Sequence, residues 1–264
     1  MYRYFDAHSH IHGQEYDSDR EEVLARMKEN GVGTITVGTH LESSKAAVGL
    51  AHKEEGVWAS IGLHPTDTDE NFDFDQYQEL VAHPKVVAIG ECGLDYFRLG
   101  VNAEEEKVRQ KKNFWLQLEF AVTHAKPLMI HCRPSGKTMD AHLDMLSILE
   151  ARKRTYGDAL WGNIHFFTGT PEIAKRYFDL GFTISISGII TFTDEYDALI
   201  KESPIEKLLS ETDSPYATPV PFRGKRNEPV FVIETIKEMA ALRGILEEEM
   251  ALKLSENLRR VFGV

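Results

Sequence analysis

Cysteine is scarce in this chain of 264 residues, which contains two cysteines, Cys92 and Cys132. Two cysteines cannot make the disulfide framework that is typical of small secreted proteins, so a reducing compartment is expected. No uncharged apolar stretch approaches the ~20 residues that a membrane-spanning helix needs. The first residues also lack a basic region followed by an apolar run, so no secretory signal is expected. These absences make the cytoplasm the expected location, without membrane association.

Positive charge is also in short supply. Lys and Arg number 30 against 42 Asp and Glu, which gives a formal net charge of −12 at pH 7. Proteins that bind nucleic acid over a large area usually carry a basic face, so electrostatic binding of nucleic acid over a large surface is not expected. A local basic patch is still compatible with the sequence. Clustered acidic and imidazole groups are ligands whose charge bound divalent cations would offset.

Short β-rich apolar segments alternate regularly with longer amphipathic ones, and no linker or low-complexity tract interrupts them. Eight strands are expected, at 4–8, 33–37, 57–62, 86–90, 127–131, 162–166, 182–187 and 208–212. Helices are expected at 18–30, 41–55, 74–82, 103–125, 136–153, 171–180, 193–202, 229–243 and 247–262. Asp or Ser before several helix starts and Gly after several ends supply the caps that helices need.

This alternation predicts the fold class. Strands that alternate with crossover helices imply parallel pairing, and eight such units are the number that closes a (β/α)8 TIM barrel. The sequence therefore predicts an α/β barrel domain that spans residues 1–264. A doubly wound open sheet is the alternative. It is disfavoured because His8-Ser9-His10, and not a Gly-x-Gly-x-x-Gly fingerprint, follows the first expected strand.

Histidines gather at the ends of the expected strands, where the active sites of such barrels lie. Five of the 11 are found there, namely His8, His10, His64, His131 and His165. Because side chains alternate along a strand, Asp6, His8 and His10 should project from one face, so that two imidazoles meet at one point. Burying so many polar groups together without a shared partner is costly, and a metal cluster supplies that partner.

The remaining histidines include five that fall in expected helices or loops, where solvent exposure is expected: His40, His52, His83, His124 and His142. The two cysteines each follow a candidate ligand on a strand and should face the opposite way. We therefore expect Cys92 and Cys132 to be buried packing residues and not ligands.

Longer motifs surround these strand ends. They are Asp6-Ala7-His8-Ser9-His10, Gly62-Leu63-His64-Pro65, Gly90-Glu91-Cys92-Gly93-Leu94-Asp95-Tyr96, Gln110 with Phe114, Ile130-His131-Cys132-Arg133, His165-Phe166-Phe167-Thr168-Gly169, Glu211-Thr212-Asp213-Ser214-Pro215 and Arg223-Gly224-Lys225-Arg226-Asn227-Glu228-Pro229. In order and spacing this set resembles the motifs of the TatD family of metal-dependent deoxyribonucleases, within the amidohydrolase superfamily. The resemblance covers essentially the whole chain.

The resemblance implies a pair of divalent metal ions. By it, one ion would be held by His8, His10, Glu91 and Asp213, and the other by Glu91, His131 and His165. The residues themselves agree with Glu91 as the bridge, because two ions about 3.5–4 Å apart need a shared carboxylate and Glu91 is the acid at the centre of the strand-end set. The lysine bridge of many superfamily members is not expected here, since Lys85 lies at the other end of its strand.

The identity of the ions stays open between Mg, Mn and Zn. Mixed histidine and carboxylate ligands suit zinc, manganese, cobalt or nickel, whereas magnesium prefers oxygen ligands. The nuclease activity of the family nonetheless resembles a magnesium-dependent one, so the ion that copurifies and the ion that is used need not be the same.

The expected chemistry is metal-assisted hydrolysis of a phosphodiester. Asp213 is expected to take the proton of the attacking water, with Glu91 as the bridging ligand and His64 as a contact to a phosphate oxygen or to the leaving group. The candidate phosphate-binding residues are Arg133, Arg223, Lys225 and Arg226. Aromatic residues near the mouth that could stack on an unpaired base are Tyr96, Phe97, Phe167 and Tyr216.

Three functions are compatible with these residues. The first is a 3′-to-5′ exonuclease-type deoxyribonuclease that acts on single-stranded or frayed DNA, with RNA as a further candidate substrate and no obligate protein partner. The second is a hydrolase of a small amide, ester or phosphoester, because the same dinuclear barrel supports many chemistries and the acidic net charge agrees with it. The third, a protein that only binds metal, is disfavoured because holding an ion needs no general base.

Overall fold

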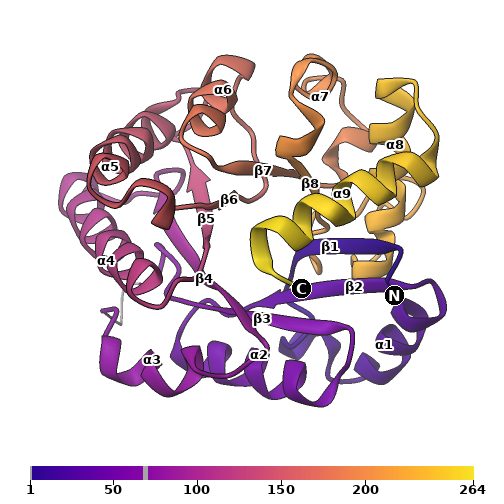
Figure 1. Cartoon of the computed structure of the whole chain (residues 1–264), viewed down its shortest axis with the longest axis horizontal. Coiled ribbons are helices and arrows are strands. Elements are labelled where there is room, and N and C mark those ends of the chain that lie inside the picture. Colours follow the sequence, from indigo (N-terminus) through magenta and orange to yellow (C-terminus); the bar gives the residue numbers. More distant parts are fainter. Residues whose placement is uncertain (1, 68–70) are drawn as a thin grey trace.

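The computed structural model describes residues 2–67 and 71–264, and in this part of the chain eight parallel strands form one sheet that curves into a barrel (Figure 1). The strands are β1 (Tyr4–Ser9), β2 (Val32–Val37), β3 (Val57–Ile61), β4 (Val86–Asp95), β5 (Leu128–Arg133), β6 (Gly162–Ile164), β7 (Thr183–Ile186) and β8 (Leu208–Ser210). Each strand pairs with the next one along the chain, in the order β1 to β8. The prediction of a (β/α)8 barrel is confirmed.

Helices follow the strands and surround the barrel (Figure 1). They are α1 (Arg20–Glu29), α2 (Leu41–Lys53), α3 (Phe74–Val81), α4 (Ala103–Thr123), α5 (Asp140–Tyr156), α6 (Pro171–Asp179), α7 (Asp197–Glu202), α8 (Val232–Arg243) and α9 (Glu247–Phe262). Local sequence explains several starts. At α6, for example, the Thr170 hydroxyl accepts from the Ile173 amide at 3.4 Å, and Pro171 occupies the first turn, where its missing N–H costs nothing.

Two helices begin four residues later than predicted. The helix expected from residue 136 begins at Asp140, because the Asp140 carboxylate accepts from the Ser135 amide and hydroxyl and holds the intervening residues in a turn. The helix expected from residue 193 begins at Asp197. There the Glu195 amide donates to the Thr193 hydroxyl at 3.3 Å, a local bond that competes with helix formation.

Strand lengths also differ from the prediction. Strand β4 was expected to end at residue 90 but continues to Asp95, because Gly93 and Asp95 pair with His131 and Arg133 of β5. Strands β6 and β8 instead stop two residues early, at Ile164 and Ser210. The long β4 keeps the residues after Gly90 inside the sheet.

Strand β1 meets β8 at a seam that holds part of the candidate site. Ser9 and Ser214 form a parallel bridge across it. The His10 amide donates to the Ser214 carbonyl at 2.8 Å, and the Asp213 amide donates to the His8 carbonyl at 2.9 Å. These bonds place two histidines and an acid from opposite ends of the chain side by side.

Asp6 stabilises the same seam from the other side of β1. Its carboxylate accepts from the Thr212 amide and hydroxyl, both at 2.8 Å, and from the Thr34 hydroxyl at 3.2 Å. The Ser9 hydroxyl also contacts Thr34, at 2.8 Å, so Asp6 and Ser9 lie on the same side. The prediction that Asp6 shares a face with His8 was therefore wrong, because an irregularity in the pairing with β2 between Asp6 and Ser9 breaks the alternation.

The hydrophobic core has two parts. The larger part lies between the barrel and the surrounding helices, and both cysteines are buried in it, as expected. The smaller part fills the barrel and comprises Phe5, Ala7, Ile35, Val37, Val87, Ala88, Met129 and Leu209, together with Leu258, Val261 and Phe262 of α9. These strand residues come from β1, β2, β4, β5 and β8, and such distant strands can share a cluster only inside the barrel.

Helix α9 closes the end of the barrel at which the strands begin (Figure 1). The indole N–H of Trp161, just before β6, donates to the Val261 carbonyl at 3.0 Å. The Asn257 amide group donates to the Leu208 carbonyl, at the start of β8, at 2.9 Å. The opposite end, where the strands finish, carries the candidate site.

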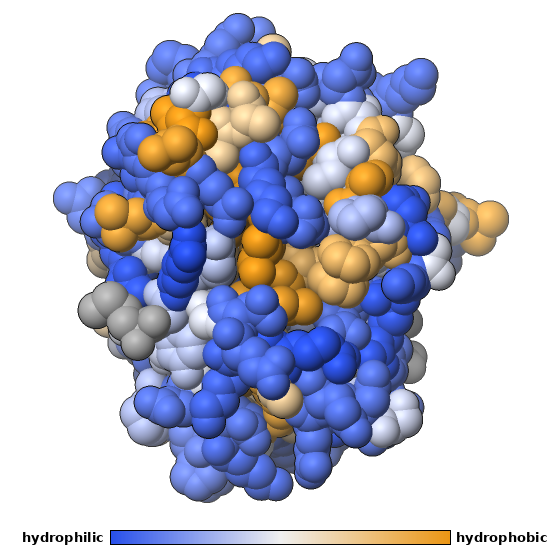
Figure 2. Space-filling view, turned by 90° about the vertical axis from the view of Figure 1, so that its right-hand side faces the viewer, coloured by the Kyte–Doolittle hydropathy of each residue, from blue (hydrophilic) through white to orange (hydrophobic). Residues whose placement is uncertain are grey.

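The face that Figure 2 shows is mainly hydrophilic. On the face that carries α1 and α8, hydrophobic residues gather near the centre and hydrophilic ones surround them (Figure 2). No helix within residues 2–67 and 71–264 combines the length and the apolar character that crossing a membrane requires.

The role of α9 can be tested with Leu258→Ala. Leu258 is 1% exposed in the barrel cluster, so the variant should lose about 2–5 kcal/mol of unfolding free energy in denaturant titrations. The matched control is Leu252→Ala on the same helix, where the side chain is 56% exposed and the loss should stay within about 0.5 kcal/mol. Equal losses for the two variants would contradict a specific role of α9 in closing the barrel.

Candidate metal centre

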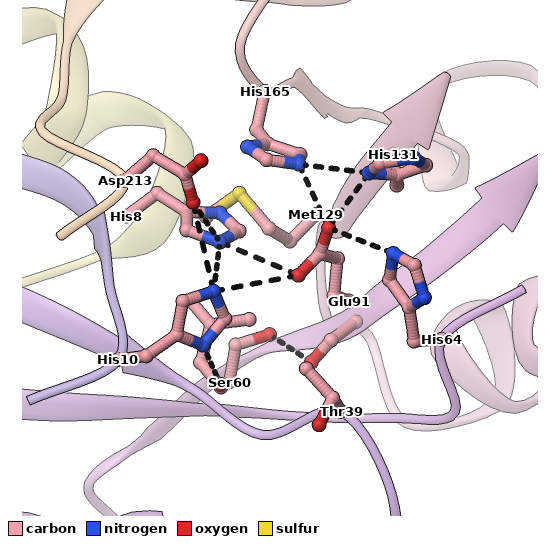
Figure 3. A network of polar contacts seen from close by, with 12 residues as sticks. His8, His10, Thr39, Ser60, His64, Glu91, Met129, His131, His165 and Asp213 are labelled. Carbon is pink, nitrogen blue, oxygen red and sulfur yellow. Dashed lines mark hydrogen bonds and ion pairs between the residues drawn. The ribbon is translucent and has the colours of Figure 1, made fainter. Parts of the chain in front are cut away.

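The structure brings the six predicted ligands together where the strands end (Figure 3). Strands β1, β4 and β5 carry or directly precede four of them, and the segments after β6 and β8 carry the other two. The six residues are His8, His10, Glu91, His131, His165 and Asp213. Glu91 lies at the centre of this group, and its two carboxylate oxygens face different neighbours (Figure 3).

The first group surrounds Glu91 Oε2. His8 Nε2 lies 3.2 Å from His10 Nε2, 3.4 Å from Glu91 Oε2 and 3.7 Å from Asp213 Oδ1. His10 Nε2 lies 3.7 Å from Glu91 Oε2 and 3.6 Å from Asp213 Oδ1. These four atoms thus enclose one small volume next to the seam between β1 and β8.

The second group surrounds Glu91 Oε1. His131 Nδ1 and His165 Nε2 each lie 2.8 Å from this oxygen and 3.3 Å from each other. His64 Nε2 lies 3.4 Å from the same oxygen, so His64 also reaches the cluster (Figure 3). Glu91 is therefore shared between two groups of side chains, which is the arrangement that a bridging carboxylate requires.

The donor atoms fit a divalent metal ion. Four ligand atoms at about 2.0–2.1 Å from one tetrahedral ion stand roughly 3.3–3.4 Å apart. In the first group the five distances given above run from 3.2 to 3.7 Å, so an ion would need small adjustments of the side chains. Imidazole nitrogen with carboxylate oxygen is also a donor set that zinc, manganese and related ions accept.

Outer hydrogen bonds orient two of the histidine rings. His10 Nδ1 lies 2.8 Å from the Val37 carbonyl, and His131 Nε2 lies 2.9 Å from Asp95 Oδ2. An acceptor behind the second ring nitrogen is the usual arrangement for a histidine that binds metal, because it fixes the ring and the tautomer. The contacts therefore point the remaining nitrogens of both rings towards Glu91.

Sequence reasoning assigned no role to two of the acids at this site, Asp95 and Glu211. Asp95 contacts His131, and Glu211 Oε1 lies 3.4 Å from His165 Nδ1, so the expectation that Glu91 is the central acid missed two further carboxylates beside the ligands. Their spacing was a usable signal. Asp95 lies four residues after Glu91 on one strand, and Glu211 two residues before Asp213, and even spacings place side chains on the same face.

Electrostatics keep the two acids among the predicted ligands ionised. Burial alone would raise the pKa of Glu91, but the neighbouring His165, His64 and His8 outweigh burial and hold the pKa well below its usual value. Burial likewise opposes ionisation of Asp213, yet the hydrogen bond from His10 and the charges of nearby histidines lower its pKa. Both groups are therefore carboxylates at neutral pH, the form in which they could bind a metal ion.

The backbone around these ligands is specialised. A Cβ at Gly90 would lie 2.2 Å from the Met129 carbonyl oxygen, and one at Gly93 would lie 1.9 Å from the His131 carbonyl oxygen. Glycine at these positions allows β5 to approach Glu91 closely. Asp213 has a φ of +54°, a left-handed conformation that costs a non-glycine residue about 1–3 kcal/mol, so the surrounding contacts must hold it there.

The predicted basic residues occupy different surroundings. The Arg133 guanidinium lies 3.9 Å from the centroid of the Phe97 ring, and the Arg223 guanidinium lies 4.1 Å from that of Phe192. Arg133, Arg223 and Lys225 are exposed. Arg226 instead makes two hydrogen bonds to the Asp19 carboxylate, at 2.8 and 2.6 Å. Phosphate binding by any of these residues stays a prediction.

The candidate aromatic residues divide into two pairs. Phe97 and Tyr216 are 46% and 58% exposed, and the Tyr216 ring lies 6.3 Å from the His10 ring, so both are available to a ligand at the mouth. Tyr96 and Phe167 are 2% and 3% exposed and pack in the core.

His142 departs from the prediction of a solvated histidine. Its side chain is buried, its Nδ1 lies 3.1 Å from the Tyr177 hydroxyl, and burial lowers its pKa to about 4. The prediction failed because α5 turns this residue towards the core between helices. His52 is exposed as expected, and His40, His83 and His124 are partly exposed.

Residues 5–263 match a family model described as TatD related DNase. The uncharacterized metal-dependent hydrolase YabD of Bacillus subtilis (strain 168) is 38% identical over 267 residues, which cover 98% of this chain and 99% of that protein. A protein of Cronobacter sakazakii named 3′-5′ ssDNA/RNA exonuclease TatD is 33% identical over 270 residues, which cover 98% of this chain and 97% of that protein.

Solved structures show the same architecture. YJJV, a TatD homologue from Escherichia coli K12, matches with a TM-score of 0.88 and 28% identity over 99% of this chain and 98% of that one. A hydrolase from Entamoeba histolytica matches with a TM-score of 0.82 and 24% identity, again over 99% of this chain and 98% of that one.

The contact between Asp95 and His131 makes a testable prediction. Asp95→Asn weakens the acceptor behind the His131 ring, so the affinity for Zn²⁺ in a chelator-competition titration should fall about 10–100-fold. Asp179→Asn makes the same chemical change on α6, where Asp179 pairs with Lys175 at the surface, and should leave the affinity unchanged. Unchanged affinity in Asp95→Asn would show that His131 does not depend on this acceptor.

Proposed function

The chain belongs to the family of TatD related DNases, which are metal-dependent hydrolases, and on that premise we propose that it is a deoxyribonuclease of the 3′-to-5′ exonuclease type. Its substrate would be single-stranded or frayed DNA, with RNA as a second substrate. Relatives named 3′-5′ ssDNA/RNA exonuclease support the choice of substrate. Two divalent ions, Mg, Mn or Zn, would be its cofactors.

The observation that carries this proposal is the shared carboxylate of Glu91. One oxygen faces His8 and His10, while the other faces His131 and His165 (Figure 3). Two ions held on either side of such a carboxylate would lower the pKa of a shared water and clamp the attacking and leaving oxygens of an in-line displacement.

The cluster has a buried floor and an accessible rim. The side chains of His8, His165 and Glu91 are at most 5% exposed. Those of His10, His64, His131 and Asp213 are 15–17% exposed. A phosphate group that approaches from the barrel mouth would therefore meet the rim residues first.

Asp213 is the proposed general base. Its Oδ1 faces His8 and His10, and Oδ2 is the atom that we assign to take the proton of the attacking water. Burial raises the pKa of Asp213, but the hydrogen bond from His10 and the charges of His8, His165 and His10 together lower it, so this carboxylate is ionised at neutral pH and can accept a proton.

His64 is the proposed donor to a phosphate oxygen. Its Nδ1 accepts from the Thr66 amide at 3.2 Å, which places the ring proton of the neutral imidazole on Nε2. Burial lowers the pKa of His64, so the neutral form prevails at pH 7. The Nε2–H group therefore faces the cluster as a hydrogen-bond donor, which suits substrate contact better than metal ligation.

Arginine stacked on phenylalanine forms a second proposed substrate contact. Arg133 on Phe97 and Arg223 on Phe192 each combine a cation with an exposed aromatic face, a pairing that suits a phosphate and an unpaired base. Lys225 adds exposed positive charge, while Arg226 would have to leave its ion pair with Asp19 to take part.

The alternative is a hydrolase of a small amide, ester or phosphoester on the same cluster. The formal net charge of −12 favours it, because a polyanionic substrate must approach against that charge.

A substrate panel separates the two functions. We expect 5′-labelled single-stranded oligonucleotides to be shortened in the presence of Mg, Mn or Zn, faster than a nitrophenyl phosphodiester or amides are cleaved. Glu91→Ala and Asp213→Ala should reduce turnover to background. Turnover of amides or small esters with intact oligonucleotides would show that the nuclease assignment is wrong.

The basic residues at the mouth should affect only long substrates. In the Arg133→Gln, Arg223→Gln and Lys225→Gln variants, each phosphate contact that is lost should flatten the slope of log affinity against log salt by ~0.7. Cleavage of the nitrophenyl phosphodiester should persist. Lys253→Gln, on α9 at the other end of the barrel, is the control and should leave the slope unchanged. A slope unaltered in all variants would exclude these residues from substrate binding.

A further inference from the structure

Three buried polar atoms lie together behind the cluster. His8 Nδ1, His165 Nδ1 and Glu211 Oε1 are each buried without a hydrogen-bond partner among the residues that the structure describes. The same three residues form a group whose donor atoms lie within 4.8 Å of one another. Buried polar atoms in proteins are nearly always paired, so three unpaired atoms in one place indicate an interaction among them.

The two rings share one orientation. His8 and His165 are stacked with their centroids 3.8 Å apart and their planes 14° from parallel. Their Nε2 atoms lie 3.4 and 2.8 Å from Glu91, on the side of the proposed ions (Figure 3). The Nδ1 atom of His165 points away from Glu91 and lies 3.4 Å from Glu211 Oε1.

Glu211 is fully buried, and its two carboxylate oxygens have different surroundings. The Ser185 hydroxyl donates to Oε2, and the Asn163 amide group donates to the Ser185 hydroxyl oxygen at 2.8 Å. This chain of bonds holds the carboxylate in place, while Oε1 faces His165 Nδ1.

A third metal ion does not suit this position. If His8 and His165 use Nε2 for the front cluster, an ion at both Nδ1 atoms would require each ring to lose its second proton. Two ring N–H groups and one carboxylate oxygen are instead matched as donors and acceptor. His10 and His131 already show this pattern, with Val37 and Asp95 as acceptors.

We propose that Glu211 is a positioning residue that accepts hydrogen bonds from the Nδ1–H groups of both His8 and His165. The contact to His165 measures 3.4 Å, and the interaction with His8, whose donor atom in this group lies within 4.8 Å of that of Glu211, would be direct or through one water molecule. His8 and His165 belong to different groups around Glu91, so Glu211 couples the two proposed ion sites from behind. The inference rests on the two-ion site proposed above but not on the nature of the substrate.

Zinc binding provides the first test. Glu211→Ala should weaken Zn²⁺ binding at both sites by about 10–100-fold in calorimetric titrations, because both rings lose their acceptor. Glu211→Gln should recover part of this loss, since its amide oxygen can still accept. Asp95→Asn is the contrasting variant and should weaken one site, the one that contains His131. Weakening of one site in Glu211→Ala would overturn the shared role, and so would unchanged binding.

The NMR signals of the histidine ring protons provide a second test, which does not depend on catalytic activity. In zinc-loaded protein with ¹⁵N-labelled histidine, the Nδ1–H signals of His8 and His165 should be visible and slow to exchange with water. In Glu211→Gln both signals should shift, and the signal of His131 should stay in place. If Glu211→Ala fails to fold, Ser185→Ala, which frees the carboxylate to move, should shift the same two signals.

The outcomes separate this inference from the proposed function. Coupled loss of both ions with no cleavage of oligonucleotides in the wild-type protein would support the role of Glu211 and refute the nuclease assignment. Cleavage of oligonucleotides with unchanged signals for His8 and His165 in Glu211→Gln would do the reverse.

Discussion

The structure depends on one buried carboxylate surrounded by imidazoles. Glu91 lies within 3.7 Å of five histidine rings, and its negative charge survives burial because those rings and any bound cations compensate it. Such an arrangement cannot form locally, because the five rings come from the ends of β1, β3, β5 and β6, which are far apart in the sequence. The fold must therefore supply side chains from five strand ends at one point.

Two contacts between neighbouring strands of the barrel meet this requirement. At β4 and β5, Gly90 and Gly93 remove the side chains that would keep the strands apart, and the Glu91 carboxylate reaches the centre. At β8 and β1, backbone bonds link Asp213 to His8, while the Asp6 carboxylate fastens the outer side of the seam. Hydrophobic packing inside the barrel and against α9, at the end where the strands begin, supports both contacts.

The parts of this arrangement that follow from local pattern could be predicted. The eight strands follow from the alternation of apolar and amphipathic segments, and the placement of the histidines follows from the position of each motif at a strand end. The resemblance to the TatD family grouped the predicted ligands. Features that depend on distant partners could not. The length of β4 is set by pairing with β5, the face of Asp6 by an irregularity against β2, and the burial of His142 by packing between helices. The even spacing of Asp95 and Glu211 from the predicted ligands was a usable signal, but their contacts with His131 and His165 arise only when the ends of separate strands meet.

The seam between β8 and β1 has a consequence for synthesis of the protein on the ribosome. His8 and His10 are translated before their partner Asp213 and before the closing helix α9. A nascent chain can assemble the strands in order, but it cannot complete the cluster until Asp213 has been translated. The complete cluster is therefore absent from translation products that end before Asp213.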